Sequence, residues 1–100
     1  MSLNGRYEVN EIIKFEAQFK ELLKSFPERI ALNLNYLEYI DSSGIGSLIR
    51  CMNITAHNNT KFVCFDLNET ILSVFITARL DQYIPLLALD DFNSLFDDSN

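Results

Sequence analysis

The stretch that decides the fold is Asp41-Ser42-Ser43-Gly44-Ile45-Gly46-Ser47-Leu48. An apolar run over residues 30–34, continued over 36–40, comes before it, and apolar residues at helical spacing follow it. A turn of small polar residues that opens a helix leaves backbone N–H groups and hydroxyls at the helix start. We therefore expect a strand to end at this turn, a helix to begin in it, and a serine hydroxyl to face outward.

Before this turn, the chain has the pattern of a helix followed by a strand. Apolar residues recur at helical spacing over residues 12–26, with Asn10 as the expected N-cap and Pro27 after the end of the helix. Apolar and other residues then alternate over 30–34, which predicts a strand.

After the turn, the same alternation of helices and strands continues. The helix that begins in the turn should fade near His57, and residues 62–65 form a continuous apolar run typical of a strand buried on both faces of a parallel sheet. Asn68 is expected to start a third helix, and residues 83–86 to form a last strand that Pro85 confines to an edge. A short final helix should be capped by Asp90 or Asp91 and carry Phe92, Leu95 and Phe96.

This order of elements predicts an α/β fold. Connections of about 2–6 residues and right-handed crossovers give a mostly parallel sheet built from consecutive β-α units. Folds of this kind place their sites at the carboxyl ends of the strands, where the turn after residue 40 lies. One hundred residues with 48% apolar content support one core, so we expect a single domain over residues 1–100.

Composition limits the classes of partner. The net charge is −6, and Lys and Arg gather nowhere, which disfavours direct nucleic-acid binding. An acidic surface also disfavours docking on anionic lipid. No apolar run approaches membrane-spanning length, and the N-terminus lacks a signal segment, so we expect a cytoplasmic protein with protein partners and no membrane attachment.

The residues give little support to catalytic, metal or cofactor chemistry. A serine nucleophile needs a general base within roughly 2.6–3.2 Å, whereas His57, the one histidine, lies about 21 Å along the helix from Ser43. Cys51, Cys64 and His57 form no familiar metal-ligand set, and we expect both thiols to be buried. No Walker-type phosphate loop is present. We therefore expect neither an enzyme nor a resident cofactor or metal.

The block from Leu32 to Gly46 resembles the signature of the STAS domain, in particular that of the bacterial anti-sigma-factor antagonists. It combines a strand, an aromatic-apolar lead-in, the Asp-Ser-Ser-Gly-apolar-Gly turn and an amphipathic helix. Further similarity covers residues 62–66 and Leu80-Asp81, and Leu3-Asn4-Gly5 resembles the Leu-x-Gly element that ends the family's first parallel strand. The resemblance spans nearly the whole chain.

The resemblance implies a phosphorylation-controlled partner switch. In such systems the unmodified antagonist binds an anti-sigma factor that is also a serine kinase, so that the sigma factor is released and transcription follows. The kinase then phosphorylates a serine in the turn, the complex falls apart, and a PP2C-type phosphatase resets the cycle. On this chain the acceptor would be Ser42. The partner-binding residues would be Asp41, Ser42, Ser43, Gly44 and Ile45. The alternative is a STAS accessory subunit of a lipid-transport ATPase or of another signalling assembly.

Two departures from the family pattern affect these expectations. Only Met1 and Ser2 precede Leu3, where the family usually has an N-terminal hairpin, so we expect a shortened N-terminal strand region. Its edge should be open or covered by something else, for example a second copy of the chain in a homodimer. Ala78-Arg79-Leu80 stands where the family commonly has a Gly-Leu pair, which affects the loop there and part of the partner surface.

Each residue of the turn also has a purely structural interpretation. Asp41 and the two serines can act as helix caps, each worth about 1 kcal/mol. Capping and phosphorylation can coexist if Ser43 caps while the preceding serine stays exposed, and Asp41 can instead orient that serine or meet a basic partner residue. For Gly44, close approach of a partner and internal packing weigh evenly, whereas Gly46 is expected to let the helix pack tightly on the sheet. Ile45 is either an exposed anchor for the partner or a core residue.

Overall fold

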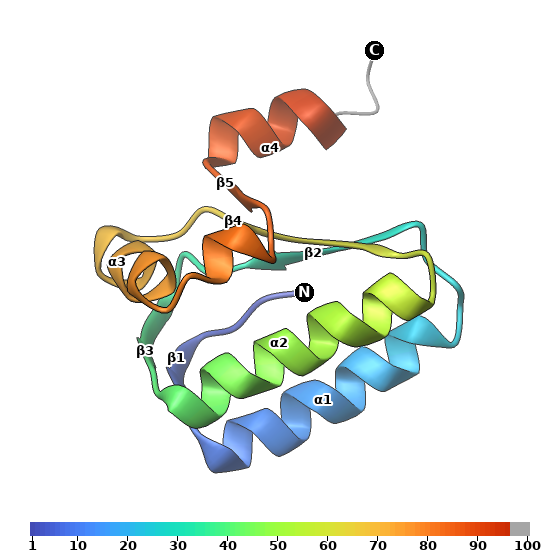
Figure 1. Cartoon of the computed structure of the whole chain (residues 1–100), viewed down its shortest axis with the longest axis horizontal. Coiled ribbons are helices and arrows are strands. Elements are labelled where there is room, and N and C mark those ends of the chain that lie inside the picture. Colours follow the sequence, from blue (N-terminus) through green and yellow to red (C-terminus); the bar gives the residue numbers. More distant parts are fainter. Residues whose placement is uncertain (97–100) are drawn as a thin grey trace.

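The computed structural model describes residues 1–96, in which strands and α-helices alternate along the chain except where two strands follow each other between the first two helices (Figure 1). The protein has an α/β fold with parallel strands, as the sequence predicts. The strands are β1 (Gly5–Tyr7), β2 (Arg29–Asn33), β3 (Leu37–Ile40), β4 (Lys61–Phe65) and β5 (Leu86–Leu87). The helices are α1 (Val9–Leu23), α2 (Ser42–His57), α3 (Glu69–Thr77), the 3₁₀ helix η1 (Leu80–Gln82) and α4 (Leu89–Phe96).

The strands form two parallel sets. β1 pairs with β3, and the other set has the order β2-β4-β5. β2 and β3 are halves of one apolar run, separated by a turn in which the Leu37 N–H donates to the Leu34 carbonyl at 3.2 Å. The segment before β1 runs along β2, since the Asn33 N–H donates to the Met1 carbonyl at 2.8 Å and the Leu3 N–H donates to the Asn33 carbonyl at 3.1 Å. Within residues 1–96, no further strand pairs with the outer edge of β1.

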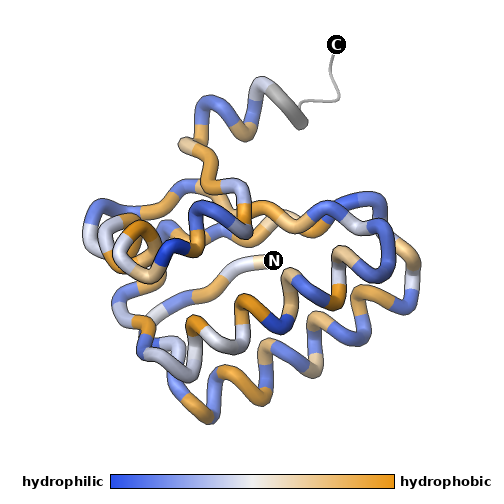
Figure 2. The backbone as a smooth tube through the Cα atoms, viewed as in Figure 1, coloured by the Kyte–Doolittle hydropathy of each residue, from blue (hydrophilic) through white to orange (hydrophobic). Residues whose placement is uncertain are grey.

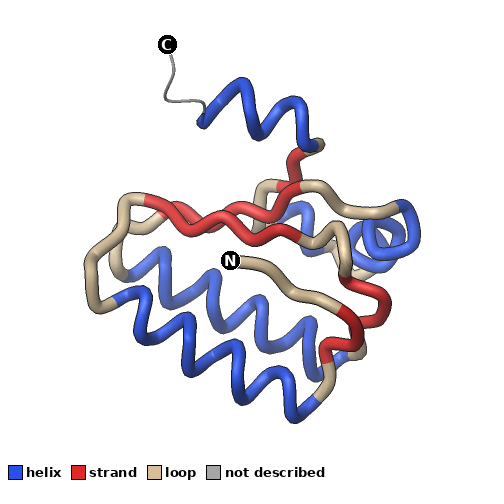
Figure 3. Tube along the Cα trace, turned by 180° about the vertical axis from the view of Figure 1, so that it is seen from behind, coloured by secondary structure: helices blue, strands red, loops and turns tan. Residues whose placement is uncertain are grey.

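The helices cover the strands unequally. α1 and α2 pack side by side on one side of the strands, and α4 lies on the opposite side (Figures 1 and 3). α3 contacts β3. Hydrophobic and hydrophilic residues alternate along α1 with the helical period (Figure 2), as expected of a helix with one buried face. The core between these layers contains Tyr7, Phe15, Phe19, Leu32, Leu48, Phe62, Ile71 and Phe75.

The first helix differs from the expectation at both ends. It starts at Val9 after Glu8, so Asn10 lies inside the first turn and does not cap the helix. It ends at Leu23, and Phe26 lies beyond it with 83% of its surface exposed. Phe26 adopts a φ of 51°, a left-handed conformation that terminates helices, so its side chain leaves the buried face that the helical spacing assigned to it.

The central strand and the second helix agree with the expectation. β4 lies between β2 and β5, and Phe62, Val63 and Cys64 are all buried, as the continuous apolar run predicts. α2 ends at His57, the predicted position. Cys51 and Cys64 are free and buried, which confirms the prediction of two buried thiols.

The second half of the chain contains two corrections. Asn68 caps α3 as predicted, because its Oδ1 accepts from the Ile71 N–H at 3.0 Å. The last strand, however, covers only Leu86–Leu87. The residues before it belong to η1 and to the turn that follows it, in which the Ile84 N–H donates to the Leu80 carbonyl at 2.8 Å, so they are not extended. β5 does lie at a sheet edge, as the nearby proline indicates.

The final helix begins two or three residues earlier than expected. α4 starts at Leu89, so Asp90 and Asp91 lie in its first turn and are not its cap. Phe92 stacks on Phe65 of β4, with ring centroids 3.9 Å apart. The predicted roles of the Leu95 and Phe96 side chains fall outside what the structure describes. Every helix in residues 1–96 is too short or not apolar enough to span a membrane.

Candidate functional site

The residue at the head of α2 is Asp41, and it is the helix cap. Its backbone is extended, its Oδ1 accepts from the Gly44 N–H at 2.9 Å, and its carbonyl accepts from the Ile45 N–H at 3.0 Å. The acceptor and the N–H are three residues apart because a side-chain acceptor just before a helix reaches the N–H groups of its first turn. Of the three roles weighed for Asp41 on sequence, the structure therefore shows the cap.

The two serines of the turn are both exposed. Because Asp41 already supplies the cap, Ser43 does not act as one, which corrects that expectation. Within residues 1–96, neither the Ser42 nor the Ser43 hydroxyl has a hydrogen-bond partner. The first turn of α2 therefore presents two unengaged hydroxyls at the carboxyl end of β3, beside backbone N–H groups that a helix leaves unpaired.

The buried side of the same turn is occupied by Gly44. A Cβ on Gly44 would lie 2.7 Å from Cδ2 of Tyr7, 2.8 Å from Cγ1 of Ile40 and 3.0 Å from the Tyr7 carbonyl oxygen. Gly44 is buried, so it serves packing within this chain, and a partner backbone cannot approach it closely. Gly46 is the reverse case, because its added Cβ would meet only Nη1 of Arg50 at 3.6 Å. The tight packing expected at Gly46 is thus found at Gly44.

A buried hydrogen bond lies one turn further along α2. The Tyr7 and Ser47 hydroxyls are 2.8 Å apart, and the two residues are 1% and 0% exposed. Burial raises the pKa of the Tyr7 hydroxyl, and it raises the pKa of the neighbouring Cys51 thiol to about 12. Sequence reasoning missed this pair. The available signal was a polar residue, Ser47, on the apolar face of a predicted helix.

Ile45 is half-buried, and its role as an anchor for a partner stays a prediction. It packs partly against the core and also lines a groove of about 310 Å³ between α2 and α3. The other lining residues are Ser73, Val74, Thr77 and Ala78. The loop after α3 holds Arg79 in the left-handed conformation, with φ 61°, so a non-glycine residue adopts there the backbone that glycine favours.

A polar hollow of about 720 Å³ lies on the other side of the turn. It is lined by Asn4, Arg6, Glu8, Val9, Asn10, Glu11 and Asp41. The Arg6 guanidinium donates to Glu8 at 3.0 Å and lies 4.0 Å from the Tyr39 ring centroid. The hydrogen bond that Arg6 donates to Glu8 is the main cause that raises the pKa of Arg6. The one basic group of this hollow is thus already engaged with an acid and an aromatic ring.

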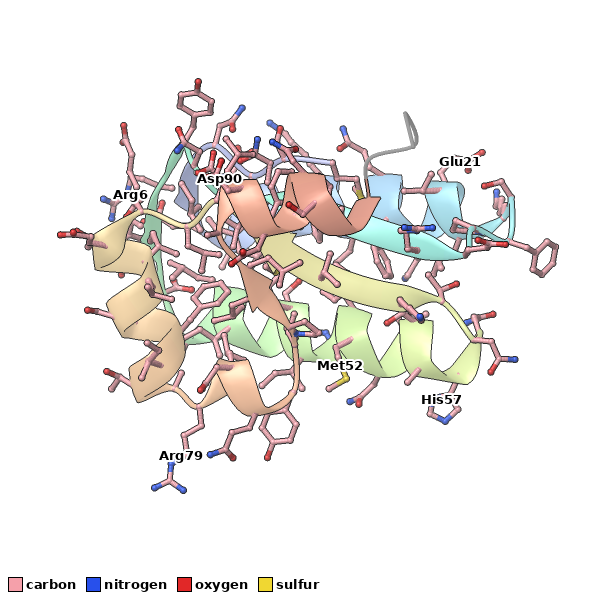
Figure 4. All side chains as sticks on the ribbon, turned by 90° about the horizontal axis from the view of Figure 1, so that it is seen from above. Arg6, Glu21, Met52, His57, Arg79 and Asp90 are labelled. Carbon is pink, nitrogen blue, oxygen red and sulfur yellow. The ribbon has the colours of Figure 1, made fainter. Side chains whose placement is uncertain are left out.

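The remaining titratable candidates lie away from the turn. His57 is exposed in the last turn of α2, where its Nδ1 is 2.8 Å from the Asn53 carbonyl, at the opposite end of the molecule from Arg6 (Figure 4). No cluster of His, Cys, Asp and Glu within residues 1–96 is arranged to hold a metal ion. No family model matches the chain. At the turn itself, the structure shows two exposed hydroxyls that have no hydrogen-bond partner within residues 1–96.

Proposed function

We propose that this protein is a cytoplasmic antagonist of an anti-sigma factor, controlled by phosphorylation of Ser42. The observation that carries the proposal is the exposed Ser42 hydroxyl, which has no hydrogen-bond partner within residues 1–96 and stands on a helix already capped by Asp41. A kinase can reach this hydroxyl without breaking an existing hydrogen bond. The resemblance of residues 32–46 to the STAS signature supplies the class of partner, an anti-sigma factor with serine kinase activity.

A phosphate at Ser42 is compatible with the fold of this chain. It adds roughly −1.5 to −2 charges at pH 7. The start of α2 offers free N–H groups and the positive end of the helix dipole, which stabilise an anion. Asp41 opposes this effect, because its carboxylate is next to the modified residue. We expect these two terms to leave the domain folded in the phosphorylated form.

The same charge disrupts an interface that was formed around a hydroxyl. A loss of about 3–4 kcal/mol from steric and electrostatic clash lowers affinity several-hundredfold. Asp41, Ser42 and Ser43 would form the switchable part of the interface. The groove lined by Ile45 adjoins them and would accept an apolar side chain of the partner. Gly44 would contribute from beneath, by allowing the turn to pack on β1 and β3.

The acceptor is tested by phosphorylation in a lysate of the source cells. The purified protein is incubated with lysate and ATP, and the phosphate is located by mass spectrometry. We expect labelling of Ser42 in the wild type and in Ser43→Ala, the matched control one residue away, and none in Ser42→Ala. Equal labelling of Ser42→Ala and wild type would overturn the assignment. A PP2C-type phosphatase should remove the phosphate.

The class of partner is tested by capture with Ser42→Ala as bait and Ser42→Asp as the control. Ser42→Ala should retain an ATPase of the histidine-kinase-like class, and Ser42→Asp should fold, as judged by circular dichroism, but retain several-hundredfold less. Capture of a transporter subunit by both variants would replace the proposal with the accessory-subunit alternative.

A further inference from the structure

We infer that Tyr7 is a positioning residue for the Ser42 turn, acting from beneath through Gly44 and Ser47, so that the hydroxyl is held at the surface in a fixed place. The functional value of that placement rests on the proposed function. The contacts of Tyr7 with Gly44 and Ser47, called the clamp below, lie within the chain and do not depend on it. The clamp assigns a role to a buried tyrosine of β1 and a buried serine of α2, which the sequence pattern alone did not single out.

The clamp has two parts on one face of α2. Gly44 and Ser47 are three residues apart, and residues at this spacing lie on the same side of a helix. The Tyr7 ring occupies the space that a side chain on Gly44 would need, with Cδ2 2.7 Å from the ideal Cβ position, and the Tyr7 hydroxyl bonds Ser47 at 2.8 Å. One side chain therefore sets the distance of the helix start from β1 and fixes its rotation.

Tyr7 is itself held firmly. Its ring contacts Phe15 of α1 edge to face, with centroids 5.6 Å apart, and β1 is paired with β3 at Tyr7 and Ile40. Cγ1 of Ile40 also lies 2.8 Å from the ideal Cβ position of Gly44, and Ile40 directly precedes the cap Asp41. The start of α2 is thus connected through Tyr7 to α1 and through the chain to β3. Ser42 and Ser43 take no part in these contacts, because both are exposed and neither hydroxyl has a hydrogen-bond partner within residues 1–96.

This arrangement constrains how phosphorylation acts. The exposed Ser42 is two residues from Gly44 and five from Ser47, a spacing that turns it to the other side of the helix, so a phosphate on Ser42 points away from the clamp. The turn keeps its place when modified, and the switch operates by direct blockade of the partner. Loss of the Tyr7–Ser47 bond should instead allow the first turn of α2 to open more often while the rest of the helix stays formed.

The experiment is amide hydrogen exchange, followed by NMR, on Tyr7→Phe and on a matched control. Thr55→Val is the control, because Thr55 is a buried hydroxyl near the other end of α2 that donates to the Met52 carbonyl at 2.8 Å. We expect Tyr7→Phe to speed exchange at the Gly44 and Ile45 N–H groups at least tenfold and to leave residues 54–57 unchanged. Thr55→Val should show the reverse pattern.

A second pair of variants separates positioning from general stability. Ser47→Ala should reproduce the local effect of Tyr7→Phe. The double variant Tyr7→Phe/Ser47→Ala leaves no unpaired buried hydroxyl, so its denaturation midpoint should recover toward wild type while first-turn exchange stays fast. Exchange that rises uniformly along α2 in Tyr7→Phe, in proportion to lost global stability, would overturn the inference.

A functional readout distinguishes failure of this inference from failure of the proposed function. In the lysate assay, Tyr7→Phe should need at least fivefold more protein for half-maximal Ser42 labelling, whereas Thr55→Val should match the wild type. Normal Ser42 labelling of Tyr7→Phe together with uniform exchange would reject the clamp and leave the phosphorylation switch in place. Local exchange as expected, with Ser42 unlabelled in every variant, would retain the clamp and reject the switch.

Discussion

The starts of α2 and α3 are capped with the same geometry, but they are anchored to the strands in different ways. Asp41 and Asn68 each accept from the N–H three residues on, at 2.9 and 3.0 Å. The Asn68 amide also donates to the Leu37 carbonyl at 2.8 Å, so its side chain joins α3 to β3 from the cap itself. An aspartate has no donor for such a bond, and α2 is instead tied from beneath by Tyr7. The comparison teaches that anchoring α2 through its buried side leaves its outer residues available to other molecules.

The largest effect should come from filling the space beneath α2. Gly44→Ala places a methyl group within 3.0 Å of Tyr7 and Ile40, and overpacking of this kind costs about 1–3 kcal/mol. The matched control is Gly46→Ala, whose methyl group meets only Nη1 of Arg50 at an ordinary contact distance of 3.6 Å. It should stabilise by up to about 1 kcal/mol, because alanine favours a helix over glycine. Urea denaturation of both variants measures the difference. Equal stabilities would show that α2 is not held closely by Tyr7.

The two caps should differ in their cost of removal. Asn68→Ala loses the cap and the bond to Leu37, and should lower the free energy of unfolding by about 2 kcal/mol. Asp41→Ala loses only the cap and should cost about 1 kcal/mol. Both are measured by chemical denaturation. A larger cost at Asp41 than at Asn68 would reverse the comparison drawn above.

Alkaline pH should destabilise the buried side of α2. The pKa of Cys51 is raised from 9.0 to about 12, and the pKa of Tyr7 is raised above its ordinary 10.0, both by burial. The folded state keeps these protons while the unfolded chain releases them, so their stabilisation is complete below about pH 9 and is lost as pH rises. Each group contributes up to about 1.4 kcal/mol per pH unit.

Single variants measure the parts of this alkaline loss that come from Cys51 and Tyr7, while the buried Cys64, whose pKa burial also raises, keeps its own part in both. Cys51→Ala should reduce the fall in the free energy of unfolding from pH 9 upward, and Tyr7→Phe should reduce it only above pH 10. The measurement is the denaturation midpoint as a function of pH. A wild-type profile that stays level to pH 11 would show that these groups are not buried in solution.

The smallest effect should be at the exposed serines. Ser42→Ala and Ser42→Asp should each change the free energy of unfolding by less than about 0.5 kcal/mol, because Ser42 is exposed and makes no hydrogen bond within residues 1–96. Ser43→Ala is the control and should behave alike. A cost above 1 kcal/mol at Ser42 in thermal denaturation would mean that its hydroxyl has an internal role.

Features set by local chemistry could be predicted from the sequence. The bounds of α2, the central position of β4 and the cap at Asn68 follow from residues within a few positions of each other. The parallel α/β arrangement follows from the order of the elements. The end of α1, which the sequence pattern placed wrongly, also depends on local conformation. Phe26 fits the helical period, but the chain leaves the helix three residues earlier through a left-handed turn.

The buried half of the site could not be predicted, because it depends on contacts between distant residues. Tyr7 and Ser47 are 40 residues apart, and their bond requires both the pairing of β1 with β3 and the rotation of α2 about its axis. The same rotation decides that Gly44 and not Gly46 faces the strands. Sequence spacing places both glycines in the first turns of the helix, but it does not state which one faces inward.

The burial of both cysteines gives this protein a built-in probe of local opening. The chain contains two cysteines, Cys51 at 1% and Cys64 at 0% exposure, and a thiol reagent needs an accessible thiolate. An Ellman-type reagent should therefore modify neither sulfur until α2 and β4 separate. The rate of colour development under native conditions would then report how accessible the buried sulfurs become through such openings, without any label or engineered residue.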